Sequence, residues 1–184
     1  VTINSATLVN KGLEIIEAHY LFDMPYSQIE AVIHPQSVVH SMVQYVDGST
    51  IAQASPPNMK GPISLAINFP DRIKGATAAI DWSTSHTWTF APIDNERFPA
   101  IDLARRCGTL GGGLPAIFNA ANEVCVAAFI AEKIGFTAII ETVEEVVQSL
   151  GSKSAGALRD LADVSAIEND ARKIAHELIS KVAR

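Results

Sequence analysis

The chain has 184 residues, of which 48% are hydrophobic and 18% are charged, a balance typical of a folded globular protein of one or two domains. A formal net charge of -6 argues against nucleic acid as the main partner, because binding to phosphate backbones requires a basic surface. No apolar run approaches the roughly 20 residues of a membrane span, so we expect a cytoplasmic protein that does not enter a membrane.

The first residues predict a strand followed by a helix. The sequence VTIN, residues 1–4, is typical of the end of a strand already under way, and we expect that an upstream part of the protein is missing. Asn4 or Ser5 can then cap a helix that runs to about Leu21, because both side chains accept hydrogen bonds from the free N–H groups of a first turn. Pro25 prevents this helix from continuing.

A small sheet is predicted next. The segments IEAVIHP (29–35) and SVVHSMVQYVDGSTIAQASP (37–56) are rich in β-branched residues. The Asp47-Gly48 step lies between two such runs, which is a hairpin signal. We therefore expect about three antiparallel strands, followed by a short helix over 60–67 that has Pro62 in its first turn.

The second half of the chain has a different character. Periodicity fails over residues 70–99, where Asp, Ser, Thr and Pro accumulate, and this indicates a long connection. Beyond Phe98 the apolar residues recur at helical spacings between Gly-rich breaks, which predicts a bundle of about four helices. The expected fold class is α+β: a small, mostly antiparallel sheet with helices over 1–69, a linker over 70–94 and a C-terminal helical bundle over 95–184.

Two faces are predicted for the first helix at roughly 100° per residue. The apolar stripe consists of Val9, Leu13, Ile16 and Tyr20. The opposite side carries Thr7, Asn10, Lys11 and Glu14. On the residues alone, a solvated face with a Lys11–Glu14 pair is the favoured interpretation, and a binding surface is the alternative.

The chemistry of this face permits a binding site for an anion and a cation. Ser5 is predicted at the entrance of the helix, where free N–H groups and the helix dipole favour an anion. A phosphate can use Ser5 and Asn10 as neutral donors and Lys11 as a point charge. Glu14 offers the oxygen ligands that a hard divalent cation requires, although one carboxylate is not a metal site. Gly12 costs about 0.5–1 kcal/mol against Ala in mid-helix, which indicates either close packing or the approach of a ligand.

Three stretches together resemble the 1-deoxy-D-xylulose 5-phosphate reductoisomerases. They are INSATLVNKGLEIIEA (3–18), IHPQSVVHSMVQYVDGS (33–49) and FNAANEVCVAAFIAEKIGF (118–136). The resemblance covers nearly the whole chain and implies the later part of the catalytic domain together with the C-terminal helical domain. It implies an NADPH-dependent enzyme that rearranges and reduces a ketose phosphate to 2-C-methyl-D-erythritol 4-phosphate in isoprenoid biosynthesis, in the bacterial cytoplasm or in a plastid-type organelle.

The resemblance also implies roles for individual residues. Ser5, Asn10 and Lys11 match the positions that hold the substrate phosphate, and Glu14 matches a ligand of Mg²⁺ or Mn²⁺ that acts with two upstream acidic residues absent from this chain. Met59 lies in the loop that the family places near the nicotinamide ring. The family is homodimeric. Because the NADPH-binding domain is absent from this chain, we expect the 184 residues to be inactive alone.

Other polar residues are expected to be structural. His34 and His40 are interpreted as structural or outer-sphere residues rather than metal ligands. Asn122, with Asn119 one turn before it, is expected to satisfy backbone groups between packed helices. Cys107 and Cys125 have no CxxC spacing, and we expect both to be buried thiols.

Two other functions remain open on the sequence. Lys11 is a candidate Schiff-base nucleophile of an aldolase-like enzyme, although a neighbouring Glu14 opposes that role because such lysines are activated by desolvation or by nearby positive charge. The chain can also be a non-enzymatic dimerisation or interaction module, since exposed sheet edges pair between subunits.

Overall fold

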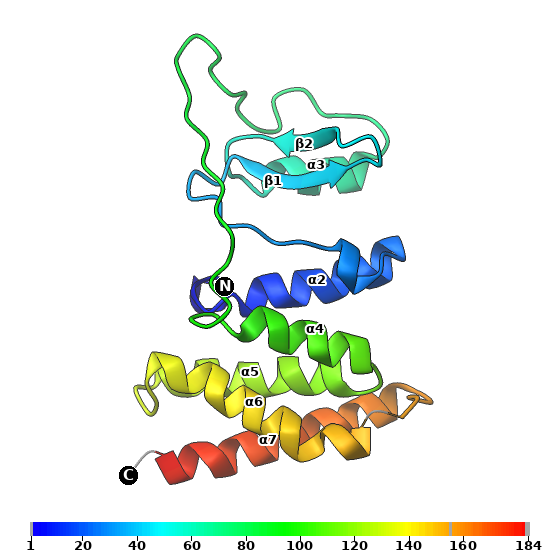
Figure 1. Ribbon diagram of the computed structural model, residues 1–184, viewed down its shortest axis with the longest axis vertical. Coiled ribbons are helices and arrows are strands. Elements are labelled where there is room, and N and C mark those ends of the chain that lie inside the picture. Colours follow the sequence, from blue (N-terminus) through cyan, green and yellow to red (C-terminus); the bar gives the residue numbers. More distant parts are fainter. Residues whose placement is uncertain (1, 155, 183–184) are drawn as a thin grey trace. The chain divides into compact units, whose positions relative to one another are not determined.

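The computed structural model describes residues 2–154 and 156–182. The chain folds as two compact units: a helical unit formed by Val1–Ala31 with Asp94–Arg184, and a hairpin unit formed by Val32–Ile93 (Figure 1). This division differs from the expected boundaries at 1–69, 70–94 and 95–184. The first 31 residues join the C-terminal helices because they bury apolar side chains against them, and the sequence pattern does not reveal that partner.

Helices stacked in layers form the helical unit (Figure 1). Its elements are α1 (Thr2–Ala6), α2 (Val9–Phe22), the 3₁₀-helix η1 (Tyr26–Gln28), α4 (Ala100–Leu110), α5 (Leu114–Ile130), α6 (Phe136–Ser154) and α7 (Leu161–Val182). Helix α2 packs on α4, α4 packs on α5, and α5 contacts both α6 and α7. The largest fully buried side chains include Phe118, Leu114 and Ile117 on α5 and Ile139 and Val143 on α6. The predicted bundle of about four helices, α4 to α7, and the α+β class are confirmed.

The start of the chain differs from the prediction. Thr2–Ala6 is a short helix rather than a strand, while Val1 lies outside the described residues. The predicted continuous helix is interrupted at Leu8, whose φ of 62° is left-handed. Thr7, expected on the polar face, is only 6% exposed: its Oγ1 donates to the carbonyl of Ile3 at 3.2 Å and accepts from the N–H of Val9 at 3.4 Å. Packing therefore fixes a bend that no Gly or Pro marks in the sequence.

The buried stripe of α2 is rotated relative to the predicted one. Val9, Gly12, Ile15 and Ile16 are the buried residues of α2. Tyr20, predicted on this stripe, is 65% exposed, so that expectation is wrong. The stripe turns toward Gly12 because α4 approaches the helix there, and this leaves Tyr20 outside the contact.

The hairpin unit contains an antiparallel pair, β1 (Val39–Gln44) and β2 (Thr50–Ala54), and helix α3 (Lys60–Asn68). The predicted Asp47-Gly48 turn is confirmed: Gly48 has a φ of 86°, and Asp47 Oδ1 accepts from the N–H and Oγ of Ser49 at 2.9 and 2.6 Å. The predicted third strand is wrong. Its segment contributes only an isolated bridge between Ile33 and Ala91, because Pro35 lacks an N–H group and cannot extend a ladder.

Apolar side chains remain exposed on the hairpin unit. Val43 and Ile51 are cross-strand partners and are 57% and 64% exposed. On and just after α3, Ile67 and Phe69 are 81% and 78% exposed. An isolated two-stranded hairpin is marginally stable in water, and contiguous exposed apolar surface is typical of an interaction site.

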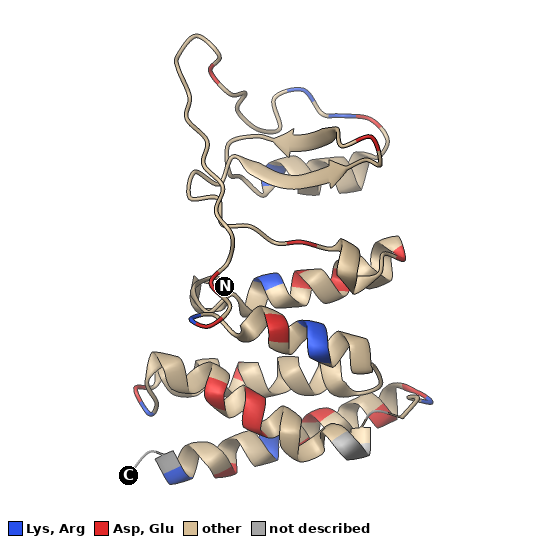
Figure 2. Ribbon diagram, viewed as in Figure 1, with Lys and Arg blue, Asp and Glu red and all other residues tan. Residues whose placement is uncertain are grey.

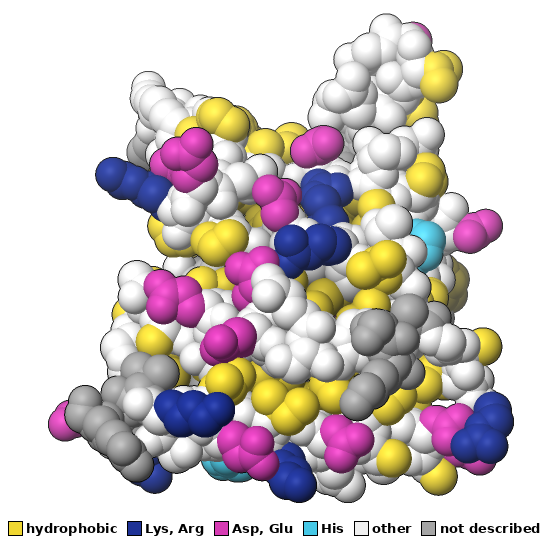
Figure 3. Space-filling view, turned by 60° about the horizontal axis from the view of Figure 1, so that its bottom comes forward, with side chains coloured by type: hydrophobic (Ala, Val, Ile, Leu, Met, Phe, Trp, Pro, Cys, Tyr) yellow, Lys and Arg dark blue, Asp and Glu magenta, His cyan; other side chains and the backbone are white. Residues whose placement is uncertain are grey.

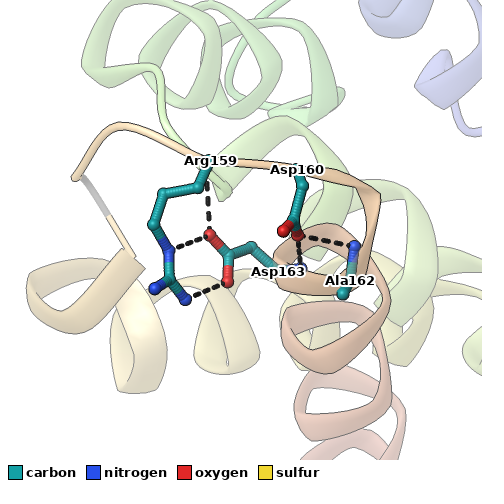
Figure 4. Close-up of polar contacts among 4 residues, drawn as sticks. All are labelled: Arg159, Asp160, Ala162 and Asp163. Atoms are coloured by element: carbon teal, nitrogen blue, oxygen red, sulfur yellow. Dashed lines mark hydrogen bonds and ion pairs between the residues drawn. The ribbon is translucent and has the colours of Figure 1, made fainter.

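Ion pairs and caps tie down the outer helices of the helical unit. Arg159 forms a two-pronged contact with Asp163, with Nε and Nη2 at 2.9 and 2.6 Å from its carboxylate (Figure 4). The hydrogen bond from the Arg159 side chain, followed by the one from its N–H, lowers the pKa of Asp163 to about 2. Asp160 caps α7, because its Oδ1 accepts from the N–H groups of Ala162 and Asp163 at 2.9 and 3.0 Å.

Acidic and basic side chains are interspersed on the face shown in Figure 3. Ion pairs also join charged side chains between and within helices: Arg172 of α7 bonds Glu123 of α5 at 2.9 Å and Glu168 of its own helix at 3.1 Å. Within the described residues, no helix is both long enough and apolar enough to cross a membrane.

Candidate functional site

The structure brings together three of the predicted site residues on the outer face of α2. Asn10 Nδ2 donates to Glu14 Oε1 at 2.5 Å, and Lys11 Nζ lies 2.5 Å from Glu14 Oε2. The side chains of Lys11 and Glu14 are 42% and 44% exposed. Charged positions along α2 are visible in Figure 2. One carboxylate therefore holds both donors at the surface.

These contacts leave the three side chains available to a ligand. A solvent-accessible pair of this spacing contributes only about 0.3–0.5 kcal/mol, so its exchange for a stronger partner costs little. Asn10 and Lys11 also stand in the first turn of α2, whose first residue is Val9. The positive end of the helix dipole favours an anion there.

Ser5 is not on the same helix as the other three residues. It is exposed and belongs to α1, and its carbonyl accepts from the N–H of Leu8 at 3.2 Å across the bend. The expectation that Ser5 stands at the entrance of the long helix is therefore wrong, because that helix begins after the bend. Ser5 therefore lies on a different element from Asn10, Lys11 and Glu14.

Close helix packing accounts for Gly12. A Cβ atom at this position would lie 2.7 Å from the Cβ of Ala104 and 3.3 Å from the carbonyl oxygen of Ala100, both on α4. Carbon atoms in ordinary contact are about 3.5–4.0 Å apart. Of the two explanations that the sequence allowed, the structure favours close packing over the approach of a ligand.

Metal binding requires more ligands than the described part of this chain supplies. No group of three or more His, Cys, Asp or Glu side chains that could hold a metal ion occurs among the described residues. Glu14 fits as one hard oxygen ligand, because its carboxylate is accessible and is held only by Asn10 and Lys11 in the contacts above. It therefore contributes at most a part of such a site.

The two thiols are confirmed as buried, free cysteines. Burial raises the pKa of Cys107 and that of Cys125 to about 12. Because the thiolate is the reactive form, neither residue is a nucleophile near neutral pH.

The histidines of the hairpin unit bond backbone groups. His34 Nδ1 lies 2.9 Å from the carbonyl of Thr89, its Nε2 accepts from the N–H of Val38 at 3.2 Å, and its ring stacks on Phe90. His40 Nε2 lies 3.1 Å from the carbonyl of Ser55. These contacts support structural roles for both. Met59 precedes α3 in the same unit and is 69% exposed.

Sequence reasoning missed a side-chain contact between α5 and α1. Asn122 Nδ2 donates to Asn4 Oδ1 at 3.2 Å, whereas we expected Asn122 to bond backbone groups. Asn122 is 1% exposed. The only available signal was a polar residue within an apolar helical run, which does not identify its partner.

Comparison with known families and proteins places this geometry in context. The family described as DXP reductoisomerase C-terminal domain matches residues 54–174, and 1-deoxy-D-xylulose 5-phosphate reductoisomerase C-terminal domain matches residues 1–22. The 1-deoxy-D-xylulose 5-phosphate reductoisomerase of Kitasatospora griseola is 57% identical over 97% of this chain and 46% of its own length. That of Leifsonia xyli subsp. xyli is 62% identical over 81% of this chain and 41% of its own length.

Solved structures of similar proteins show the same fold. The reductoisomerase from Zymomonas mobilis in complex with NADPH has a TM-score of 0.89 at 44% identity, over 96% of this chain and 46% of that one. A DOX-P reductoisomerase in complex with NADPH, fosmidomycin and magnesium has a TM-score of 0.88 at 41% identity, over 97% of this chain and 45% of that one. The chain thus spans slightly less than half the length of the relatives that it matches.

Proposed function

This chain belongs to the 1-deoxy-D-xylulose 5-phosphate reductoisomerase family, and on that premise we propose that it forms the phosphate- and metal-binding side of the reductoisomerase active site. The reaction is the NADPH- and divalent-metal-dependent conversion of 1-deoxy-D-xylulose 5-phosphate to 2-C-methyl-D-erythritol 4-phosphate. The observation that carries the proposal is the convergence of Asn10, Lys11 and Glu14 on one accessible face of α2.

The phosphate of the substrate binds at the first turn of α2. Lys11 supplies a full positive charge, Asn10 supplies two N–H donors, and Ser5 supplies a hydroxyl from α1. The dipole of α2 adds a favourable potential at the same place. Because the phosphate does not react, these contacts provide binding energy that orients the distant reacting carbons.

Glu14 serves the metal end of the site. A bound Mg²⁺ or Mn²⁺ supplies Lewis-acid polarisation of the carbonyl of the substrate. Glu14 would give one carboxylate to the ion, and further ligands would be needed beyond the described residues. In this role Glu14 would give up its hydrogen bonds to Asn10 and Lys11. Both donors would then be available to the phosphate.

We assign two contacts to the hairpin unit: one with the NADPH cofactor and one with the second subunit of a homodimer. Met59 is exposed and offers an apolar contact for the nicotinamide ring of NADPH. The exposed cross-strand pair of Val43 and Ile51 offers a self-complementary surface of the kind that twofold dimers use. Light scattering of the Ile51→Lys variant tests this assignment, and an unchanged dimer mass would contradict it. The cytoplasm is the proposed location.

Steady-state kinetics of the full-length enzyme test the roles on α2. Lys11→Ala removes a charge-assisted bond worth roughly 1.5–3 kcal/mol, so we expect KM for the ketose phosphate to rise about 10- to 100-fold. Glu14→Gln should lower turnover and raise the concentration of Mg²⁺ required. Glu17→Gln is the matched control, because Glu17 is exposed on the same helix and loses the same charge. Wild-type kinetics in both site variants would refute the proposal.

The aldolase alternative gains no support from the structure. Lys11 is 42% exposed and paired with a carboxylate, whereas Schiff-base lysines are desolvated or flanked by positive charge. A dimerisation role is compatible with catalysis and is included in the proposal.

A further inference from the structure

The position of Ser5 relative to Asn10 and Lys11 is not determined by a continuous helix. Helix α1 has five residues, too few for a helix that is stable by its own hydrogen bonds. The left-handed Leu8 separates it from α2. Contacts between α1 and the rest of the helical unit must therefore hold Ser5 where a ligand on α2 can reach it.

Asn122 supplies such a contact from the centre of the bundle. Its Nδ2 donates to Oδ1 of Asn4, the residue before Ser5, at 3.2 Å. The other contacts of α1 include Ile3, whose side chain packs against the core and whose carbonyl accepts hydrogen bonds from Thr7 at the end of the same segment. A hydrogen bond fixes orientation as well as distance, so the Asn122 bond restrains the rotation of α1 about its own axis.

The burial of Asn122 is energetically costly. It is 1% exposed on a helix whose buried neighbours include Ala121, Val124 and Cys125. Its Oδ1 has no hydrogen-bond partner among the described residues. A buried polar atom left unpaired costs roughly 1–3 kcal/mol, so an apolar side chain would serve the stability of α5 at least as well. The amide therefore contributes something other than stability.

We propose that Asn122 is a positioning residue of the active site, which holds Asn4 and thereby sets Ser5 in register with Asn10 and Lys11 for the substrate phosphate. The proposal rests on the proposed function of the α2 face. Asn122 itself acts through Asn4 and does not contact the ligand. It links the interior of the C-terminal bundle to the phosphate site at the other end of the sequence.

Calorimetric titration of the full-length protein with 1-deoxy-D-xylulose 5-phosphate, with Mg²⁺ and without NADPH, tests this role. Asn122→Leu replaces the amide by an apolar group of similar size, and we expect Kd to rise on the order of tenfold with Tm unchanged or higher. Asn119→Leu is the matched control, because it makes the same change one turn earlier on α5. It should bind as the wild type does.

A double-mutant cycle with Ser5 separates positioning from general damage. In the wild-type background Ser5→Ala weakens binding. In the Asn122→Leu background it should add little, because Ser5 is already displaced. Wild-type affinity of Asn122→Leu, or an equal loss from Ser5→Ala in both backgrounds, overturns the proposal.

If Asn122→Leu does not fold, two variants of Asn4 test the same hydrogen bond. Asn4→Asp keeps an oxygen that accepts from Asn122, whereas Asn4→Leu does not. Measured at 0.15 M salt or above, where Debye screening limits the effect of the added charge, Asn4→Asp should retain affinity and Asn4→Leu should lose it. Equal affinities contradict the inference. Lys11→Ala in the same titration reports on the proposed function: if it too binds normally, the α2 face is not the phosphate site.

Discussion

Replacement of Gly12 by Ala tests the packing that places the candidate site. The new Cβ would lie 2.7 Å from the Cβ of Ala104 and 3.3 Å from the carbonyl oxygen of Ala100. Neither neighbour is a flexible side-chain end: one is the methyl group of the buried residue Ala104 and the other is a backbone carbonyl. Relief of the contact therefore requires α2 and α4 to separate by about 1 Å, given ordinary carbon–carbon contacts of about 3.5–4.0 Å.

Two opposing contributions determine the change in stability that we expect from Gly12→Ala. Overpacking of a well-filled core costs about 1–3 kcal/mol, while Ala gains about 0.5–1 kcal/mol over Gly in a helix interior. We expect a net destabilisation of roughly 1–2 kcal/mol, which corresponds to a fall in Tm of about 2–8 °C for a unit of this size. The substrate KM should rise too, because α2 carries Asn10, Lys11 and Glu14.

Thermal unfolding of the full-length protein measures this effect against a matched glycine. For Gly151 in α6, the contact found for an added Cβ among the described residues is an ordinary one, with Leu114 Cδ2 at 3.9 Å, so Gly151→Ala should stabilise by up to about 1 kcal/mol. In the double variant Gly12→Ala/Ala104→Gly the 2.7 Å contact is removed. The double variant should be more stable, by about 1 kcal/mol, than the summed changes in unfolding free energy of the two single variants predict. Stabilisation by Gly12→Ala, or additivity in the double variant, would refute the packing argument.

Three further predictions concern the caps, the charges and the thiols. Asp160→Ala should destabilise the helical unit by about 1 kcal/mol in urea unfolding, because α7 loses its N-cap. The hydrogen bonds from Arg159 lower the pKa of Asp163 to about 2. The contribution of the ionised Asp163 to stability is therefore present above about pH 4 and is lost as the pH falls toward 2. The difference in Tm between the wild type and Asp163→Asn should shrink over that range. With pKa values of about 12, Cys107 and Cys125 should resist a thiol reagent at pH 8 in the folded protein and react after denaturation.

The bundle and the hairpin could be predicted because their signals are local. Helical spacing of apolar residues identifies α4 to α7, and the Asp47-Gly48 step identifies the hairpin turn. The bend at Leu8 could not be predicted, since no Gly or Pro is present and the strained residue is held by burial of Thr7 and Val9 on either side.

Some features of the candidate site could likewise be predicted from local spacing, and others depend on the tertiary fold. Asn10, Lys11 and Glu14 fall on one face of a helix, so their proximity follows from spacing alone. The contact between Asn4 and Asn122 joins residues 118 positions apart in the sequence, and only the tertiary fold shows it. The reason for Gly12 likewise depended on knowing which helix lies opposite.

The hairpin unit interrupts the helical unit, and this affects the order in which the protein can fold. Residues 1–31 are synthesised before the hairpin unit, but the helical unit to which they belong is completed only by residues from Asp94 onward. The buried face of α2 thus has no α4 to cover it until the whole hairpin unit has been made, and long-range closure of this kind slows folding. The paired N–H and C=O groups of Ile33 and Ala91, at 2.9 and 3.0 Å, bring the outgoing and returning chains together near the junction. The helix that bears the candidate binding groups is therefore synthesised before the hairpin unit but covered by α4 only after it.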